Sequence, residues 1–426
     1  MKLIIIFITT FLFAFPMKKG DFATIDIYDN SQIEWANKFK MVDVGGLYDD
    51  RIIKRLKKLH NIKLGYDWLV AIYFYTEGEN TTFVRDLYKN RNKFTLNPKG
   101  PFLHCKRNNY SWCKEFYFNF GDEKVIEKKV NYLIKNLKEK QFSGVFFDWA
   151  SGSYILEKEY KPIYQQFKKL NPNKNYFEMI SKIYKSLKEK NILFVTNQAF
   201  RQHKYLLPYI QYDMTESYIT GVEYKKNRIM IENKGIVEKV PITNYYPIDN
   251  KSLKATLFYI DLLTKYKRKY KKYGFKNFIY LNYLAPEYKK VSELMPLYKE
   301  IIPKNGIFFS YAMAKLTDNI VYAEVSSNRK LERNDLYFYD LGKVKGKTYQ
   351  EIEKGIYIRY YENGFVLVSD VFQKDKIIKL NLKREFYDVY NNKWIKNNII
   401  KLHYHTDIMT NKKVPLGRLF MYKGIK

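Results

Sequence analysis

The stretch Gly144-Val-Phe-Phe-Asp148-Trp149 is an apolar run that ends abruptly in a carboxylate. Three consecutive apolar residues between glycine and aspartate predict a strand that is buried on both faces, as the strands of parallel sheets are. An ionised Asp at the end of such a strand leaves the apolar layer and lies at its rim. The stretch therefore predicts a parallel sheet with Asp148 at the edge formed by the carboxyl ends of the strands.

The same pattern recurs along the chain. A strand at 192–195 ends in Thr196-Asn197, and Tyr212-Asp213-Met214-Thr215-Glu216 follows where the next strand is expected. Apolar runs alternate with amphipathic, lysine-rich segments up to about residue 312, which predicts a (β/α)8 TIM barrel. The expected strands are 22–28, 41–44, 69–75, 116–120, 145–147, 192–195, 210–214, 278–281 and 307–309, and the main expected helices are 49–60, 82–89, 123–140, 176–188, 252–273 and 289–301.

The pattern changes after residue 320. Short alternating segments at 356–361 and 366–368, with a turn at Glu362-Asn-Gly364, predict antiparallel structure. We therefore expect a signal peptide at 1–17, a barrel at 18–315 and a small, β-sandwich-like antiparallel domain at 316–426.

The N-terminus has the pattern of an export signal. Lys2 precedes an apolar run from Leu3 to Phe15, which is shorter than the roughly 20 residues that a membrane span needs. Only Ala14 offers a small residue for a cleavage site, so an uncleaved membrane anchor stays as the alternative. We expect a secreted or periplasmic protein.

The charge of the chain is +32 among 426 residues, 46% of which are hydrophobic. Only 13 of the 76 basic residues are Arg, and no nucleic-acid-binding module accompanies them, so no specific nucleic-acid partner is expected. The charge instead predicts association with an anionic envelope surface. The densest basic run, 265–272, has helical spacing and is interpreted as the solvated end of a helix. We expect the protein to be a monomer.

Two cysteines, Cys105 and Cys113, lie eight positions apart in a polar segment. An exported chain with an even number of cysteines permits a local disulfide, and two free thiols are the alternative. The spacing fits no standard zinc site, and no phosphate-binding or dinucleotide motif occurs. No cofactor or metal is expected.

Polar and aromatic residues end several of the expected strands. Two carboxylates, those of Asp148 and Glu216, suit the acid and the base or nucleophile of glycoside hydrolysis, and aromatic rings can stack on sugars. Asp213 is the rival of Glu216, because an error of one residue in the strand end exchanges the inward and outward side chains. The expected substrate-binding residues at this rim are Asp43, Tyr75, Asp122, Trp149, Asn197, Asp213, Tyr218 and Tyr283.

A family resemblance rests on these motifs. Asn119-Phe-Gly-Asp122, a helix, and then Gly144-Val-Phe-Phe-Asp148 resemble the strand–Asp–helix–strand–Asp arrangement of glycoside-hydrolase-like barrels related to endo-α-1,4-polygalactosaminidase and spherulin-type proteins. Residues 359–366 are also similar to a segment in the accessory β-domain of bacterial glycosidases. The resemblance implies catalytic roles for Asp148 and Glu216. One departure is Ser143, which stands where relatives carry a second acidic residue before the glycine.

The sequence thus predicts an exported glycoside hydrolase acting on an extracellular or envelope polysaccharide or oligosaccharide. Glu216 is the expected general acid and Asp148 the base or nucleophile, with the exchange of these roles and the choice between retention and inversion left open. Two alternatives are a catalytically inactive carbohydrate-binding barrel and a basic envelope protein that binds anionic polymers.

Overall fold

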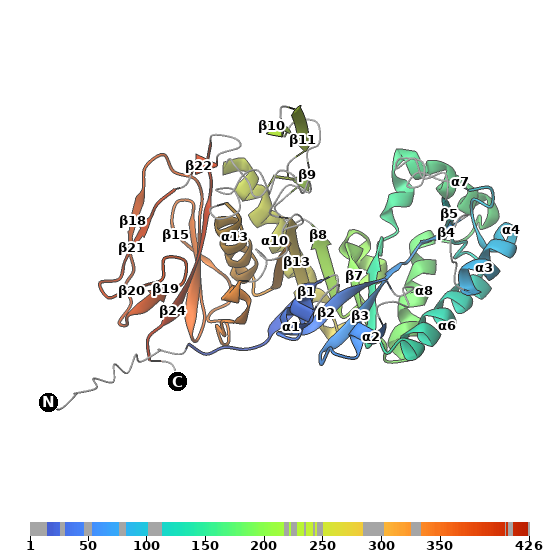
Figure 1. Cartoon of the computed structure of the whole chain (residues 1–426), viewed down its shortest axis with the longest axis horizontal. Helices are drawn as coiled ribbons and strands as arrows, with labels where there is room; N and C mark the ends of the chain where they lie inside the picture. The colour runs from blue at the N-terminus through green and yellow to red at the C-terminus, as the bar shows by residue number, and fades with distance from the viewer. Residues whose placement is uncertain are drawn as a thin grey trace.

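Eight parallel strands form one curved sheet whose order follows the chain, and helices cover its outer face (Figure 1). The strands are β1 (Gly20–Thr24), β2 (Phe39–Gly46), β3 (Ile62–Trp68), β6 (Gly144–Asp148), β7 (Leu193–Asn197), β8 (Tyr212–Glu216), β13 (Asn277–Tyr283) and β14 (Ile320–Glu324). β14 contacts β1, so the sheet is nearly closed. A separate antiparallel domain follows, which confirms the predicted (β/α)8 barrel with a C-terminal β-domain.

The computed structural model describes most of the chain. The described residues are 15–25, 30–46, 53–75, 82–100, 113–216, 221–222, 228–233, 236–241, 243–244, 250–283, 302–324, 334–404, 406–407 and 412–424. Residues 1–14, which hold most of the expected signal peptide, lie outside this set, as does the expected helix 289–301. None of the helices in the described ranges is long and apolar enough to span a membrane.

The strand β6 lies at the centre of the sheet, between β3 and β7. Val145, Phe146 and Phe147 are buried, as their unbroken apolar run predicts. Gly144 is required for close packing, because a Cβ placed there would lie 2.3 Å from the carbonyl oxygen of Leu193 on β7. The strand then ends at Asp148, which leaves the carboxylate at the rim.

Amphipathic helices cover the barrel, with their apolar faces toward the sheet. Two of them begin at side-chain caps: the carboxylate of Asp122 accepts from the Lys124 backbone N–H at 2.9 Å, and Asn175 accepts from Phe177 and Glu178. The longer helices are α6 (Glu123–Glu139), α7 (Lys161–Leu170), α8 (Tyr176–Glu189), α10 (Asn250–Tyr270) and α13 (Ile302–Leu316). The shorter ones include α1 (Asn30–Ala36), α2 (Ile53–Leu56), α3 (Thr82–Lys89), α4 (Arg91–Phe94) and α9 (His203–Leu206).

Three expected barrel strands are wrong, because 69–75 and 116–120 overlap two strands that pair with each other outside the barrel and 307–309 lies in a helix. The segment 69–75 contains a strand, β4 (Ala71–Tyr75), but it pairs antiparallel with β5 (Cys113–Tyr117) outside the barrel, and β3 is the third barrel strand. The segment 307–309 lies within α13, and the eighth strand is β14, so the barrel sheet includes residues beyond 315. α13 is buried over most of its surface between the barrel and the β-domain, so its apolar run has no polar side that would reveal helical periodicity.

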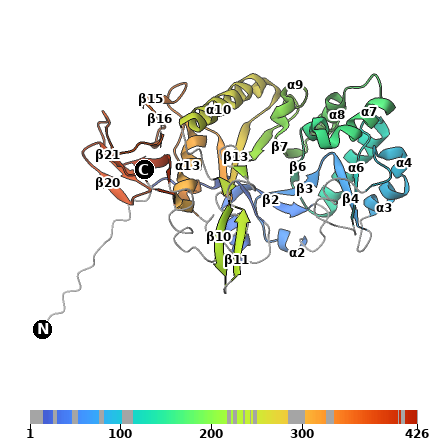
Figure 2. The ribbon, with the colours of Figure 1, turned by 90° about the horizontal axis from the view of Figure 1, so that it is seen from above.

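The C-terminal domain consists of antiparallel strands that enclose a second apolar core (Figure 2). Its main sheet contains β15 (Gln350–Glu353), β16 (Ile356–Tyr360), β17 (Gly364–Ser369), β24 (Leu416–Tyr422), β19 (Phe386–Asp388) and β20 (Lys393–Ile395), in that order. Two further pairs are β18 (Lys376–Lys379) with β21 (Ile399–Leu402), and β22 (Thr406–Asp407) with β23 (Lys412–Lys413). In the long connection after β8, β10 (Arg228–Asn233) and β11 (Ile236–Pro241) form a hairpin, and β9 (Gly221–Val222) pairs with β12 (Thr243–Asn244).

Contacts through α13 and the N-terminal segment join the two domains. Gly417 on β24 lies so close to α13 that an added Cβ would come within 2.3 Å of the Phe309 backbone. The ring of Phe15 lies 5.0 Å from that of Tyr387 and 5.7 Å from that of Trp394, measured between centroids. Residues 15–17 of the expected signal peptide therefore contact the β-domain.

A buried ion pair joins β3 to α6. Lys129 Nζ lies 2.8 Å from Asp67 Oδ2 and 3.0 Å from Oδ1, and both side chains are at most 1% exposed. Asp67 points to the outer face of the barrel, since Tyr66 and Trp68 on either side of it point inward. Breaking a buried pair leaves an uncompensated charge in an apolar layer, which is more costly than never having the pair.

We predict that Lys129→Met and Asp67→Leu each lower the free energy of unfolding by about 3–5 kcal/mol. The double variant Lys129→Met/Asp67→Leu should recover most of that loss, because it removes both charges. Urea unfolding of the four proteins measures this cycle. Losses that simply add in the double variant would contradict the role of the pair.

Candidate functional site

The carboxyl ends of β6, β7 and β8 bring two carboxylates and one amide together. Asn197 Nδ2 lies 3.0 Å from Asp148 Oδ1 and 2.7 Å from Glu216 Oε2. The side chain of Asn197 is 4% exposed, so it forms the floor between the two acidic groups. Since the three strands are adjacent and parallel, three residues far apart in the sequence meet at one rim.

Three hydrogen-bond donors surround the carboxylate of Asp148. Tyr66 Oη donates to Oδ2 at 2.5 Å, while the backbone N–H of Trp149 and the amide of Asn197 donate to Oδ1 at 2.8 and 3.0 Å. Burial and the charge of Asp148 raise the pKa of Tyr66 far above its ordinary value, so its hydroxyl stays protonated and available as a donor. Trp68 Nε1 in turn donates to Tyr66 Oη at 2.5 Å. The arrangement stabilises a negative charge on Asp148.

Glu216 lies across the Asn197 amide from Asp148. Its side chain is partly exposed, and its Oε2 accepts from the Asn197 amide. Its backbone carbonyl accepts from Gln198 Nε2 at 2.6 Å, a contact that ties the end of β8 to the turn after β7. Gln198 takes a left-handed conformation, with φ of 61°, which bends the chain sharply just after Asn197.

Asp213 occupies the opposite face of β8 from Glu216 and is completely buried. Its carboxylate accepts from Thr196 Oγ1 at 2.7 Å and from the backbone N–H groups of Ala199 and Phe200 at 2.9 and 2.8 Å. These bonds hold the turn that carries Asn197. Burial raises the pKa of Asp213 to about 7, against the opposing effect of the three donors. Asp213, an expected substrate ligand, is thus placed where it supports the turn and where solvent does not reach.

Aromatic rings form a wall beside Asp148. The ring of Trp149 stacks on that of Trp68 with a centroid distance of 4.9 Å, and the rings of Tyr117 and Tyr160 lie 6.2 and 5.9 Å from Trp149. Trp149 has a φ of 51°, which a bulky side chain adopts only where its surroundings enforce it. The same turn directs the Trp149 N–H at Asp148.

The other expected site residues are placed less directly. Asp43 is 6% exposed and accepts from Thr24 and Gly45, and its charge contributes to raising the pKa of Tyr66, so it lies near the pair. Asp122 caps α6. Tyr75 ends β4, outside the barrel sheet, and Tyr283 ends β13, but only the backbone of each is described.

Three further expected residues have no described side chain. Tyr218 and Cys105 lie outside the described residues, and of Cys113 the structure describes the backbone alone. The disulfide between the two cysteines therefore stays a prediction. Within the described part of the chain, no group of three or more His, Cys, Asp or Glu side chains is arranged to hold a metal ion.

Tyr66 and Trp68 are the residues that the sequence interpretation missed. Both belong to β3, which was not among the expected strands. The signal was present, since Ile62, Leu64, Tyr66 and Trp68 alternate with Lys63, Gly65 and Asp67 in the period of a strand. A search limited to continuous apolar runs overlooks this alternation.

No protein-family model matches the chain, and no curated protein matches it in sequence. Among solved structures, the glycoside hydrolase domain of PelA from Pseudomonas aeruginosa is similar, with 11% identity, a TM-score of 0.41 and coverage of 74% of this chain and 96% of that one. Ega3 of Aspergillus fumigatus in complex with galactosamine has 11% identity, a TM-score of 0.37 and coverage of 74% and 94%. The α-amylase of Geobacillus thermoleovorans in complex with acarbose has 10% identity, a TM-score of 0.47 and coverage of 95% and 97%. Likenesses this weak carry no argument about function, which must be argued from the site itself.

The buried carboxyl of Asp213 predicts a pH dependence of stability. Its pKa rises from an ordinary value of 3.8 to about 7 on folding, so between these values the folded protein binds more protons than the unfolded chain. The free energy of unfolding should therefore fall as pH rises through this window, by about 1.4 kcal/mol per pH unit from this group. In Asp213→Asn this contribution is absent, because an amide does not titrate. Urea unfolding of both proteins between about pH 5 and pH 8 measures the difference in slope, and equal slopes would contradict the prediction.

Proposed function

We propose that the protein is an exported glycoside hydrolase that cleaves a polysaccharide or oligosaccharide with Asp148 and Glu216. The observation that carries the proposal is the single amide of Asn197, which bonds to both carboxylates at the rim of the barrel. Two acidic groups held on either side of a small floor are what the hydrolysis of a glycosidic bond requires. The apolar run before Pro16 supports export.

The surroundings of the two carboxylates support different roles. Asp148 receives three donors that fix the orientation of its carboxylate, as attack on an anomeric carbon requires. Glu216 receives the Asn197 amide on Oε2 and is partly exposed, as Asp148 is, so it can exchange protons with substrate and water at the rim. In this assignment Glu216 protonates the leaving oxygen while Asp148 attacks the anomeric carbon. Glu216 then removes a proton from the water that releases the sugar from Asp148.

The spacing of the pair favours retention of configuration. The two hydrogens of an sp2 amide nitrogen diverge by about 120°, so bonds of 3.0 and 2.7 Å place the two acceptor oxygens about 5 Å apart. Carboxyl groups of retaining enzymes lie roughly 5–5.5 Å apart, and those of inverting enzymes roughly 6.5–9.5 Å.

Substitution of either carboxylate should reduce hydrolytic activity. Asp148→Asn and Glu216→Gln should each reduce the release of reducing ends from a panel of neutral, amino-sugar and acidic polysaccharides by about 10²- to 10⁴-fold. Glu178→Gln, which alters an exposed carboxylate on α8, is the matched control and should retain wild-type activity. Thermal unfolding of each variant verifies that the loss is not one of folding.

Other outcomes of this assay would identify the alternatives. Sugar binding without hydrolysis by the wild type would indicate a carbohydrate-binding barrel. Binding that collapses at high ionic strength, with no dependence on either carboxylate, would indicate a basic protein that holds anionic polymers by charge alone. Undiminished hydrolysis in both variants would rule out the pair.

Hydrolysis should retain the anomeric configuration of the cleaved bond. Proton NMR during the first minutes of hydrolysis should detect a product with the anomeric configuration of the cleaved bond, because the reaction passes through a glycosyl ester of Asp148. Azide should restore turnover to Asp148→Gly by attacking in place of the carboxylate, giving a glycosyl azide of inverted configuration. Release of the inverted sugar by the wild type would contradict the roles assigned here.

A further inference from the structure

A large cavity lies away from the candidate active site, between α10 and the β-domain. It has a volume of about 1050 Å³, at the upper end of what small-ligand pockets reach. Phe275, Lys276, Thr317 and Asp318 line it, and they precede β13 and β14 in the chain. This part of the groove is therefore at the amino ends of the barrel strands, the opposite end from Asp148 and Glu216.

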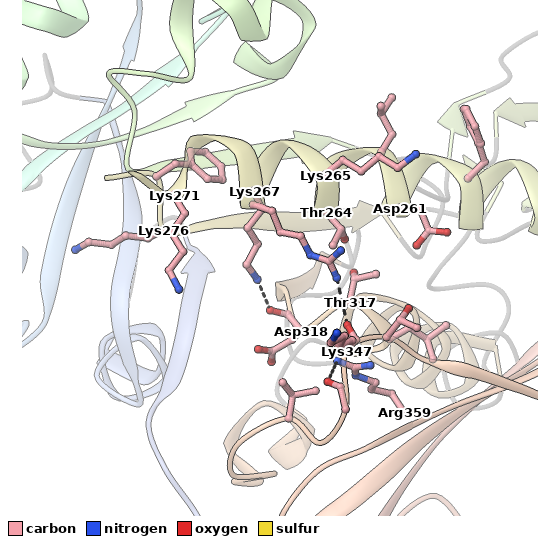
Figure 3. A pocket seen from close by; sticks show the side chains of 18 of the residues that line it. Asp261, Thr264, Lys265, Lys267, Lys271, Lys276, Thr317, Asp318, Lys347 and Arg359 are labelled. Carbon is pink, nitrogen blue, oxygen red and sulfur yellow. Dashed lines mark hydrogen bonds between the residues drawn. The ribbon is translucent and has the colours of Figure 1, made fainter. Parts of the chain in front are cut away.

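The charge of this groove is strongly positive. Its lining contains seven Lys or Arg side chains and two Asp side chains. Asp261 accepts a hydrogen bond from Tyr349 at 2.9 Å, while both hydrogen bonds of Lys267 go to neutral oxygens, those of the Asp318 backbone at 2.8 Å and the Asn319 side chain at 3.2 Å. Figure 3 shows Lys267 reaching from α10 toward Asp318. Burial and the neighbouring Lys315, Lys271 and Arg268 lower the pKa of Lys267 to about 8, and the counter-effect of Asp318 does not cancel them.

The opposite wall carries a buried guanidinium. Arg359 on β16 is 5% exposed, and its Nη2 donates to the Gly346 carbonyl at 3.0 Å. Its Nε and Nη1 are buried without a hydrogen-bond acceptor among the described residues. Leaving a buried charged donor unsatisfied costs about 1–3 kcal/mol or more. An acceptor that enters the groove beside the loop at Gly346 would relieve this cost.

An exposed aromatic ring lies on the α10 side of the groove. Phe258 is 71% exposed, whereas Phe275, the other aromatic residue of the lining, is 2% exposed. A single open ring suits one sugar face. Sites for single-stranded nucleic acid instead place several rings along the strand for successive bases, and only one ring is accessible here.

From these features we infer that the groove binds an acidic oligosaccharide, with the lysines and Arg359 facing its carboxylate groups and Phe258 stacking on one sugar. The choice of a sugar over other polyanions rests in part on the proposed glycosidase function. The site is separate from the catalytic rim, so it would hold a polymer that the barrel cleaves elsewhere along its length. The groove would thus concentrate part of the positive charge of the chain at one binding site.

Isothermal titration calorimetry with a hexamer of polygalacturonate tests the inference on the full chain. The variant Lys265→Glu/Lys271→Glu/Lys347→Glu changes three exposed groove lysines, and Lys124→Glu/Lys169→Glu/Lys190→Glu makes the same charge change at exposed positions on or beside α6, α7 and α8. We expect the groove variant to bind at least about tenfold more weakly than wild type, and the control variant to stay within about twofold. Phe258→Ala should weaken binding several-fold at constant charge.

Two further ligands identify what the groove recognises. The fully methyl-esterified hexamer has the same sugars without charge and should bind at least about tenfold more weakly than the acid. A six-nucleotide oligothymidylate carries similar charge on a different backbone and should also bind more weakly. Equal losses in the two lysine variants, equal affinity for the ester, or tighter binding of the oligonucleotide would each overturn the inference.

The experiment does not depend on catalysis. It is repeated in Glu216→Gln, where the groove variant should show the same loss of affinity. An inactive barrel with intact groove binding would refute only the proposed function. Hydrolysis by the wild type, together with an affinity for the hexamer that does not depend on the groove lysines, would refute only the inferred binding site in the groove.

Discussion

The side-chain amide of Asn197 lies between two carboxylates at the barrel rim and donates to both, which lowers the cost of holding them close together. The position of this amide is fixed because the turn that follows Asn197 is itself held in place. Asp213, on the outer face of the neighbouring strand, accepts two backbone N–H groups from that turn and a hydroxyl from Thr196. On a single strand, the inward residue Glu216 thus accepts from Asn197, while the outward residue Asp213 holds the turn that positions Asn197.

The sequence was most informative where strands are buried on both faces. Runs such as 145–147 and 192–195 were correctly predicted as central strands, so the polar residues that follow them could be placed at the rim. Sequence interpretation failed for two elements that are not strands with two apolar faces. α13 is apolar nearly all round because two domains cover it, so residues 307–309 imitate a strand. β3 has one polar face because its Asp67 pairs with Lys129 beneath a helix, and alternation alone reveals it.

The candidate site likewise contains residues that the sequence could predict and residues that it could not. Asp148, Asn197 and Glu216 could be paired from their positions in successive units of the chain. The hydroxyl of Tyr66 could not, because its approach to Asp148 depends on the register between β3 and β6. The basic run at 265–272, interpreted as a solvated helix end, lines a groove whose other wall includes Arg359. Sequence spacing cannot show a partner about ninety residues away, so the meaning of those charges appeared only with the fold.

The position of Phe15 has a consequence for how the molecule assembles. Its ring packs against Tyr387 and Trp394, and the carbonyl of Pro16 accepts from the Asp340 backbone N–H at 2.8 Å. During synthesis the chain emerges from its N-terminus, so these partners leave the ribosome hundreds of residues after Phe15. The barrel's first strand, β1, likewise contacts its last, β14. These contacts therefore form late, because the nascent chain presents β1 before β14 has been made and Phe15 before Tyr387 and Trp394 have been made.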